Sequence, residues 1–425
     1  MPSRFVFPTD LMFRNDNATV TTLKSLPNFE IEKLRHLFSV HEDLGIDPEK
    51  IKKPLLDLIK QNHMFPYYER IKPKLGIIED DFEIESFKEL NAKTLAELDE
   101  KIEFAEKNFG SSEIKDSILD KGNYYFKIGD HENTVRVYEQ ALEKTVGINS
   151  KLEIMLTILR AAFFFNDLPL LVKYMEKAKL YPPKFLFYIV NLYIFSDIEK
   201  GGDWELRNRL HIYEAVQLML CRKFKEATEL FLESLSTFTA TELISLEELV
   251  LYSIVLSLIT MGRNVINKKV LLSSEVAQVA SPGSSLYQLI SDYYNCNYKN
   301  YMKHLGIYVL DINFLVDVSK LILKDRYLGR HCRYFVRQAR LPAYKQFLRP
   351  YKSVTLKNMA DAFQVSTEFI EEELVSYISG MRLDCKIDKV NGIIENNVGD
   401  ERNNNYVKTI KQVSCFIHKI LRAIF

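Results

Sequence analysis

The sequence predicts a mainly α-helical protein, in which a solenoid of helical pairs is followed by a winged-helix module and a C-terminal helix. Three observations lead to this fold class. Apolar residues recur at three- and four-residue steps up to about residue 350. A pattern of small and aromatic residues repeats between residues 122 and 234. Beyond residue 350, two short helical patterns precede an alternating stretch with an Asn-Gly turn.

The composition is that of a folded chain with balanced charge. Of its 425 residues 47% are hydrophobic, with only 15 Gly and 13 Pro, so the chain can bury enough apolar surface to offset the entropy of ordering. The 57 basic and 57 acidic side chains cancel, which argues against nonspecific coating of nucleic acid or anionic membranes. We therefore expect partners to bind at local patches.

We expect no targeting or membrane segment. Met1–Phe13 lacks the continuous apolar run of a secretory signal. The apolar stretches Phe185–Phe195 and Leu249–Met261 are shorter than the ~18 residues that span a bilayer, so we predict buried helices there. The five cysteines form no C-x-x-C pair and are expected to be free, buried thiols in a reducing compartment. These features predict a soluble intracellular protein.

Two helices are predicted in the N-terminal region. Asp47 and Pro48 suit the N-cap and first turn of a helix. Its apolar stripe consists of Ile51, Leu55, Leu56, Leu58 and Ile59. A second helix, from Leu90 to Phe104, has an apolar face formed by Leu95, Leu98, Ile102 and Ala105.

An acidic stretch surrounds this second helix. Glu79–Glu113 contains 12 acidic and 4 basic residues, a net charge of −8. We interpret it as a solvated helix face, and a docking surface for a basic partner is the alternative.

The repeating pattern begins at Gly122 and has the spacing of a tetratricopeptide (TPR) repeat. An aromatic residue, Tyr125, follows three positions later, and the turn at Gly129-Asp130 leads into a second helix that contains Tyr138. The missing side chain at Gly122 would let Tyr138 approach closely. The pattern returns at 160–163 and at 215–218, with turns at 166–167 and 222–223. Each pair leaves one apolar face open, so the pairs must stack into a TPR-like helical-pair solenoid.

A helix boundary is predicted at Gly201-Gly202. The two glycines should end the preceding helix, and Asp203 should be the N-cap of the next one, with Glu205 in its first turn. Trp204 is the only tryptophan, and we interpret it as a wedge between helices.

The winged helix is predicted from residue 353 onwards. Helices are expected over 356–363 and 367–378, with Ser366 as the N-cap of the second. Leu383, Cys385 and Ile387 alternate with charged residues, which predicts a strand. The sequence Val390-Asn391-Gly392-Ile393 predicts a type I′ hairpin turn, and Ile393-Ile394-Glu395 the returning strand.

The charge of the second helix argues against DNA binding by this module. Between Ser366 and Ser379 lie four glutamates and neither Lys nor Arg, a net charge of −4. That face would repel phosphate groups, whereas helices that read the DNA grooves carry Arg or Lys. We therefore expect the module to bind protein.

The C-terminal helix carries an apolar stripe with heptad-like spacing. The stripe consists of Val407, Ile410, Val413, Ile417, Ile420, Leu421 and Ile424. Such a stripe requires a partner helix to cover it.

One stretch of the chain is strongly basic. Lys320–Lys352 contains ten Lys or Arg and a single acidic residue, a net charge of +9. Arg330, Arg333, Arg337 and Arg340 follow at steps of 3, 4 and 3, which places them on one face of a predicted helix. Three interpretations remain open: contact with RNA, an acidic partner protein, or pairing with the acidic helix just downstream.

We find no catalytic, metal or cofactor motif. The chain contains no phosphate-binding P-loop and no G-x-S-x-G sequence. His41-Glu42 and His131-Glu132 both lack the second histidine of a zinc protease helix, and the eight histidines show no ligand spacing. We therefore expect neither an enzyme nor a cofactor.

Helical pairs, a winged helix and a terminal helix, in this order, resemble the PCI-domain proteins. More narrowly, the chain resembles the family of the non-ATPase regulatory subunit 6 of the 26S proteasome lid. The matching stretches are LDEKIEFAEKNFGSSEIKDSIL (98–119), GGDWELRNRL (201–210), FKEATELFLESLSTFTATEL (224–243), RYFVRQARLPAYKQFLRPYKSVTL (333–356) and LDCKIDKVNGIIENN (383–397). Between Lys179 and Gly201 the chain has more residues than the family pattern.

The resemblance implies a scaffold without an active site. It implies that the winged helix adds its strand, at Leu383, Cys385 and Ile387, to an arc of PCI modules, and that the terminal helix joins a bundle with other lid subunits. The expected domains are an N-terminal helical extension (1–85), the TPR-like repeats (86–262), the PCI domain (263–397, winged helix 353–397) and the bundle helix (398–425). The expected partners are other PCI and lid subunits in a hetero-oligomer of the cytoplasm and nucleus, with neither membrane nor nucleic acid.

Two alternative functions are kept open. The chain could be a PCI subunit of the signalosome that removes the ubiquitin-like modifier from cullins, or of a translation-initiation complex. It could also be a nucleic-acid-binding adaptor that uses the Arg330–Arg340 face.

Overall fold

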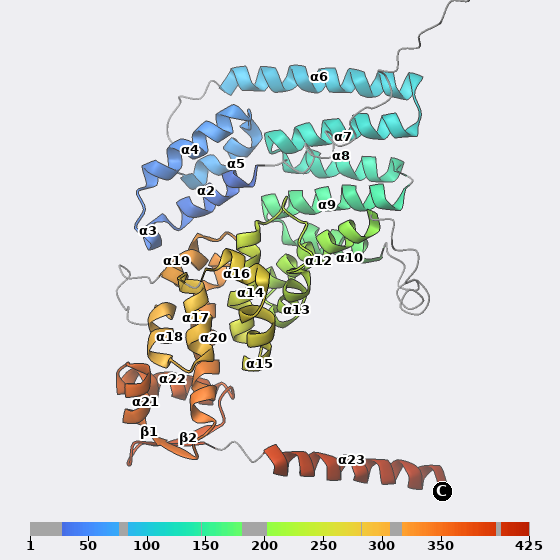
Figure 1. Ribbon diagram of the computed structural model, residues 1–425. Coiled ribbons are helices and arrows are strands. Elements are labelled where there is room, and N and C mark those ends of the chain that lie inside the picture. Colours follow the sequence, from blue (N-terminus) through green and yellow to red (C-terminus); the bar gives the residue numbers. More distant parts are fainter. Residues whose placement is uncertain are drawn as a thin grey trace, which may run out of the picture. The chain divides into compact units, whose positions relative to one another are not determined.

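A computed structural model describes residues 28–75, 84–145, 147–180, 202–281, 283–306, 317–396 and 401–424 (Figure 1). The described chain is almost entirely helical, which confirms the mainly α fold class. It divides into two compact units. The first runs up to Ser253 and includes Leu323–Arg330, and the second consists of Ile254–Ile322 and the residues from His331 onwards. The four-part domain division stays a prediction, and the helix predicted at Phe185–Phe195 lies outside the described residues.

The first unit begins with a group of short helices. They are α2 (Phe29–Ser39), α3 (His41–Leu44), α4 (Pro48–Gln61) and α5 (Phe65–Leu75). The side chain of Asn28 caps α2, and Asp47 with Pro48 begins α4 as predicted. Ile51, Leu55 and Ile59 of the predicted stripe are buried.

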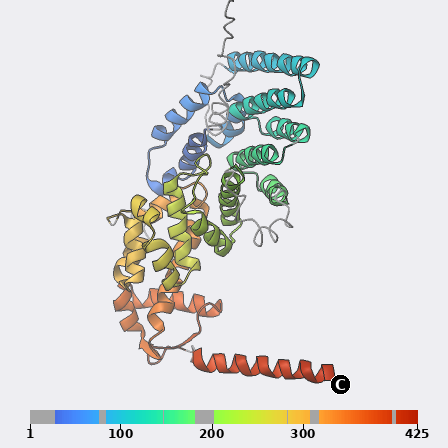
Figure 2. The same ribbon diagram turned by 45° about the vertical axis from the view of Figure 1, so that its right-hand side comes forward.

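The solenoid follows as a series of antiparallel helices. They are α6 (Ile84–Asn108), α7 (Ser111–Ile128), α8 (His131–Lys144), α9 (Ile148–Phe165), α10 (Leu168–Leu180), α12 (Gly202–Leu220) and α13 (Phe224–Ser234). Each of the pairs α7–α8, α9–α10 and α12–α13 packs tightly, and Figures 1 and 2 show α6 to α9 stacked one after another. The TPR-like solenoid is confirmed.

Two glycines make the first pair possible. A Cβ atom at Gly122 would lie 2.9 Å from Cε1 of Tyr138, so only glycine lets α8 pack this closely on α7. Gly129 ends α7 with a φ of +79°, a conformation that favours glycine. The turns at Asn166 and Arg222 also have positive φ.

The boundary at residues 201–205 differs from the prediction. Helix α12 already begins at Gly202, so Asp203 lies inside its first turn and is not the N-cap. Trp204 is 49% exposed and is not a wedge. The reason is the phase of α12, because its buried residues, among them Leu206, Arg209 and Ile212, lie on another face.

Helix α14 (Leu246–Thr260) connects the two units. Its residues Leu249, Tyr252 and Leu256 are buried, which confirms the buried helix predicted for the apolar stretch Leu249–Met261. The second unit continues with α15 (Arg263–Ile266), the π-helix η1 (Asn267–Leu271), α16 (Ser274–Val279), α17 (Ser285–Tyr294), α18 (Tyr298–Leu305), α19 (Asp317–Lys324), the 3-10 turn η3 (Gly329–His331) and α20 (Cys332–Leu348).

The winged helix has the predicted helices and one additional strand. It consists of β1 (Ser353–Thr355), α21 (Leu356–Phe363), α22 (Thr367–Ser379), β2 (Cys385–Asp388) and β3 (Ile393–Asn396). Ser366 caps α22, because its Oγ accepts a hydrogen bond from the N–H of Phe369. The sheet is antiparallel with the order β1-β3-β2, so the unpredicted β1 and the predicted β2 form its two edges.

Two details of the wing correct the prediction. Strand β2 begins at Cys385 rather than Leu383, because its partner β3 ends at Asn396, which lies opposite Cys385. The hairpin turn is not type I′, since Gly392 alone in the loop has a positive φ. The carboxylate of Asp388 instead accepts hydrogen bonds from the N–H groups of Val390 (3.0 Å) and Asn391 (3.4 Å), which organises a longer loop.

The last element is α23 (Glu401–Ile424), which follows the winged helix in the chain. Among the described residues, none of the helices has both the length and the apolar character needed to cross a bilayer. All five cysteines are free, as predicted, but only Cys332 and Cys385 are buried. Cys221, Cys296 and Cys415 are exposed because they lie in loops or on the open surface of α23.

Candidate interaction surfaces

The described residues contain no group of three or more His, Cys, Asp or Glu side chains that could hold a metal ion. The geometry instead singles out several surfaces and one buried polar cluster.

The first surface is the open edge of the winged-helix sheet. Because β2 pairs only with β3, its other edge carries backbone N–H and C=O groups available to another strand. The side chains of Leu383 and Cys385 are 7% and 4% exposed, and Ile387 is half-buried, so these side chains belong mainly to the core of the module. If β2 pairs with a strand of another chain, the contact would therefore be made by its backbone hydrogen bonds.

The acidic residues of α22 are partly used within the module. Glu373 lies 2.9 Å from Arg340 of α20 and accepts a hydrogen bond of 2.7 Å from the hydroxyl of Tyr344. Burial raises the pKa of Glu373, and Arg340 opposes this shift. Glu371 pairs with Lys389 of the wing at 2.8 Å. Glu368 and Glu372 remain exposed.

The four predicted arginines do not share one helix face. Arg330 lies in the 3-10 turn η3, before α20 begins at Cys332. Arg340 points inward to Glu373 and also lies over the ring of Phe369 at 5.4 Å. Arg333 and Arg337 are exposed. Pairing with the downstream acidic helix is therefore confirmed for Arg340.

Helix α23 exposes a continuous apolar stripe. Val407, Ile410, Val413 and Ile417 are between 50% and 66% exposed, and Phe416 is 65% exposed. Ile420, Leu421 and Ile424 fall in the same helix, but their side chains lie outside the described residues. An exposed apolar stripe of this size indicates a binding surface.

Two acidic side chains of α6 are paired within the solenoid, and others such as Glu97 and Glu100 are exposed. Asp99 forms an ion pair with Lys121 of α7, and Glu106 lies 2.8 Å from Lys144 of α8. Phe104 and Phe109 are 59% and 54% exposed at the end of this helix, with ring centroids 5.7 Å apart. The sequence patterns did not single out these two exposed rings.

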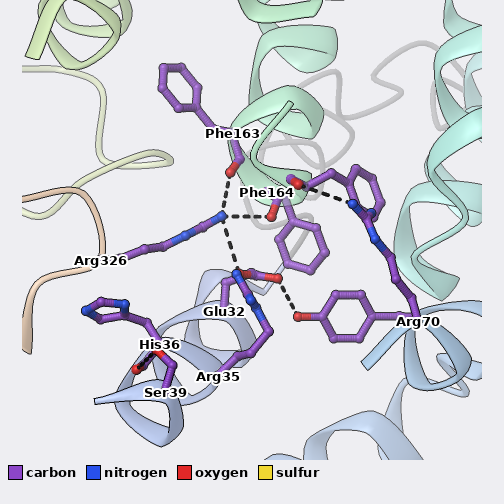
Figure 3. A network of polar contacts seen from close by, with 10 residues as sticks. Glu32, Arg35, His36, Ser39, Arg70, Phe163, Phe164 and Arg326 are labelled. Carbon is purple, nitrogen blue, oxygen red and sulfur yellow. Dashed lines mark hydrogen bonds and ion pairs between the residues drawn. The ribbon is translucent and has the colours of Figure 1, made fainter. Parts of the chain in front are cut away.

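A buried polar cluster, shown in Figure 3, ties a late segment of the chain to the first helices. This return segment, Leu323–Arg330, belongs to the first unit. The Nη2 atom of Arg326 donates to the carbonyls of Phe163 (2.5 Å) and Phe164 (2.7 Å) and lies 3.4 Å from the carboxylate of Glu32. Arg326 thus satisfies carbonyls at the C-terminal end of α9, where a cation is favoured.

Glu32 is the centre of the cluster, with 2% of its surface exposed. Its Oε2 atom accepts two hydrogen bonds from Arg35, at 2.8 and 2.6 Å, and its Oε1 atom accepts one of 2.5 Å from the hydroxyl of Tyr67. Burial and the neighbouring Glu32 raise the pKa of Tyr67, so its hydroxyl stays protonated and donates. The cluster joins α2, α5, α9 and the return segment.

His36 and Asp325 hold the two flanks of the return segment. The Nε2 atom of His36 lies 2.9 Å from the carbonyl of Leu323, and burial lowers the pKa of this histidine, so the neutral ring donates from Nε2. Asp325 accepts hydrogen bonds from the Tyr252 hydroxyl (2.7 Å) and from the N–H of Leu328 (2.6 Å). Burial raises the pKa of Asp325 to about 6.

We predict a pH dependence from Asp325. Its folded pKa, about 6, lies above the ordinary value of 3.8, so its stabilising contribution is present below pH 4 and is lost as the pH rises through 6. Asp325→Asn removes this titration. Between pH 4 and 7 the wild type should therefore lose up to ~3 kcal/mol of unfolding free energy relative to Asp325→Asn. Urea unfolding at both pH values measures the difference.

The control for this experiment is Asp361→Asn, which removes an exposed carboxylate in α21. It should follow the wild type at both pH values. If the unfolding free energies of Asp325→Asn and the wild type changed equally between the two pH values, this would contradict the role of the buried carboxyl.

A helical-repeat solenoid in one unit and a winged helix in the other define the class of PCI-domain proteins, and the family model of the PCI domain matches residues 303–397. The family model described as "26S proteasome subunit RPN7" matches residues 80–185 and 192–269. The chain belongs to the family of the 26S proteasome non-ATPase regulatory subunit 6. The interruption of the match, at 186–191, falls within the segment that is longer than the family pattern.

The curated relatives are similar over nearly their whole length. The 26S proteasome non-ATPase regulatory subunit 6 of Dictyostelium discoideum is 35% identical over 399 residues, which cover 94% of this chain and 97% of the relative. The homolog from Arabidopsis thaliana is 36% identical over 381 residues, covering 89% and 92%. The 26S proteasome regulatory subunit RPN7 of Saccharomyces cerevisiae is 32% identical over 424 residues, covering 94% and 93%.

Proposed function

We propose that this chain is a non-catalytic scaffold subunit of the 26S proteasome regulatory-particle lid, which supports the ATP-dependent degradation of ubiquitylated proteins. The observation that carries the proposal is the similarity to proteasome regulatory subunits over 94% of the chain. A solenoid joined to a winged helix fits such a role, because it offers long surfaces for protein contacts.

The proposed partners are other PCI and lid subunits, in a hetero-oligomer of the cytoplasm and nucleus. The backbone edge of β2 would extend the sheet of a neighbouring PCI module. Helices of other subunits would cover the apolar stripe of α23, since its described side chains are between 50% and 66% exposed.

The alternatives are less well supported. The relatives named above are proteasome subunits, which favours the proteasome over the signalosome or a translation-initiation complex. A nucleic-acid adaptor has less support from the geometry, since Arg340 is used within the module and Arg330 lies outside α20.

Purification of the tagged chain from cells tests this function. We expect subunits of the ATPase ring and ubiquitin receptors to co-elute, because a lid subunit is recovered with the regulatory particle. Identification of the co-eluting proteins by mass spectrometry is the measurement. Recovery of only cullin-associated partners, or of the chain alone, would overturn the assignment.

A further inference from the structure

Helix α20 presents a basic ridge, in which Arg337 interacts electrostatically with Glu373 without forming an ion pair with it. The helix contains four Arg or Lys residues and no Asp or Glu. Three of them, Arg333, Arg337 and Lys345, are exposed, and none forms an ion pair with a carboxylate among the residues that the structure describes. The fourth, Arg340, is the one that binds Glu373.

The exposed cations form one row along the helix. Arg333, Arg337, Leu341 and Lys345 are four residues apart, so they form an i, i+4 ridge of the kind that fits into the groove of a second helix. The ridge is about 18 Å long at the rise of an α-helix. Leu341, which is half-buried, places an apolar residue between two cations. We call Arg333, Arg337, Leu341 and Lys345 the α20 ridge.

We propose that the α20 ridge binds an acidic amphipathic helix of a neighbouring subunit. The inference rests on the proposed function, and it names the chemistry of one partner. Complementarity to the ridge requires carboxylates four residues apart on one face of that helix, with an apolar residue on the same face to meet Leu341. The Arg340–Glu373 pair shows that α20 already holds a carboxylate from a helix packed on it.

The charge around α20 favours a protein helix over RNA. Residues 353–396 contain eight acidic and four basic side chains, a net charge of −4. The winged helix packs on α20, as the hydrogen bond from the Tyr377 hydroxyl to the Arg337 carbonyl shows. A polyanion that ran beyond the ridge would be repelled by this module, whereas a helix of a few turns would contact the ridge alone.

A photo-crosslinking experiment in the assembled lid tests the proposal. Leu341 is replaced by p-benzoylphenylalanine in the full chain, and the complex is irradiated after purification. We expect a cross-link to one other subunit, at a helix with carboxylates at i and i+4. The matched control places the same residue at Leu272, which is 72% exposed in the same unit, and it should not give this cross-link.

A charge-reversal variant provides the second part of the cross-linking experiment. Arg333→Glu with Arg337→Glu should reduce the yield of the cross-link about tenfold, because two exposed ion pairs become repulsive. Lys268→Glu with Lys269→Glu makes the same change of charge at two other exposed positions of the second unit and should leave the yield unchanged.

The outcomes separate this proposal from the proposed function. A chain that never enters the lid contradicts the proposed function. A chain that enters the lid but gives no cross-link from position 341, or a cross-link to RNA, to a second copy of itself or to a segment without carboxylates, overturns the proposal for the α20 ridge alone.

Discussion

Replacing Arg326 by methionine should lower the free energy of unfolding of the first unit by about 3–5 kcal/mol. The side chain of Arg326 is 7% exposed, and its guanidinium binds the carbonyls of Phe163 and Phe164 beside Glu32. Methionine fills part of the volume but removes the side-chain donor from both carbonyls, of which only Phe163, within the described chain, keeps the N–H of Asn166, and it takes a cation away from a buried carboxylate. Losing one member of a buried ionic cluster costs more than the pair itself contributes, because the remaining groups stay buried.

The measurement is urea unfolding, combined with hydrogen exchange at the end of α9 and in α2. The matched control is Arg337→Met, since Arg337 is exposed, and its effect should stay within ~0.5 kcal/mol. The double variant Arg326→Met with Glu32→Met should cost less than the sum of the two single changes, because it removes both buried charges together. Equal effects of Arg326→Met and the control would contradict the role of the cluster.

Much of the fold could be predicted because its signals are local. The cap at Ser366, the close approach of Tyr138 to Gly122 and the alternation in β2 each depend on residues close together in the chain. Such signals fix helices, turns and hairpins by short-range sterics and hydrogen bonds. For the same reason the sequence predicts the two helices and the hairpin strands of the winged helix, although not β1, the first residue of β2 or the turn type.

The buried cluster could not be predicted, because it joins residues that are far apart in the chain. Nothing near Glu32 or Arg326 distinguishes them from the many surface charges around them. Arg326 finds its carbonyl partners at the end of α9, and Glu32 finds the hydroxyl of Tyr67 in α5, and only the packed unit brings these groups together. The β1 strand was missed for a similar reason, since three residues give too short a pattern and the strand forms only by pairing with β3.

For the basic stretch 320–352, the sequence alone could not show which cations are available to a partner. The spacing predicts four arginines on one helix face. In the structure Arg330 lies in η3, before α20 begins. The packing of α22 turns Arg340 inward, toward Glu373. Which cations remain for a partner is therefore decided by tertiary packing.

The double change Ile410→Asp with Ile417→Asp should leave the monomer folded and weaken its incorporation into the lid at least about 100-fold. The two side chains are 66% and 51% exposed, so the isolated chain loses little packing. In a helical bundle both carboxylates would be buried without partners, at a cost of several kcal/mol, and each 1.4 kcal/mol is a factor of ten in affinity. Native gels and co-purification with tagged lid subunits measure incorporation.

The control variant of α23 introduces two carboxylates at the same seven-residue spacing, but on a different face of the helix. Asn405→Asp with Gln412→Asp introduces two carboxylates seven residues apart at exposed polar positions of the same helix. Incorporation of this variant should match that of the wild type, because these positions lie off the apolar stripe. Normal incorporation of Ile410→Asp with Ile417→Asp would show that the stripe is not buried in the complex. Loss of incorporation in both variants would point instead to a general effect of negative charge on this helix.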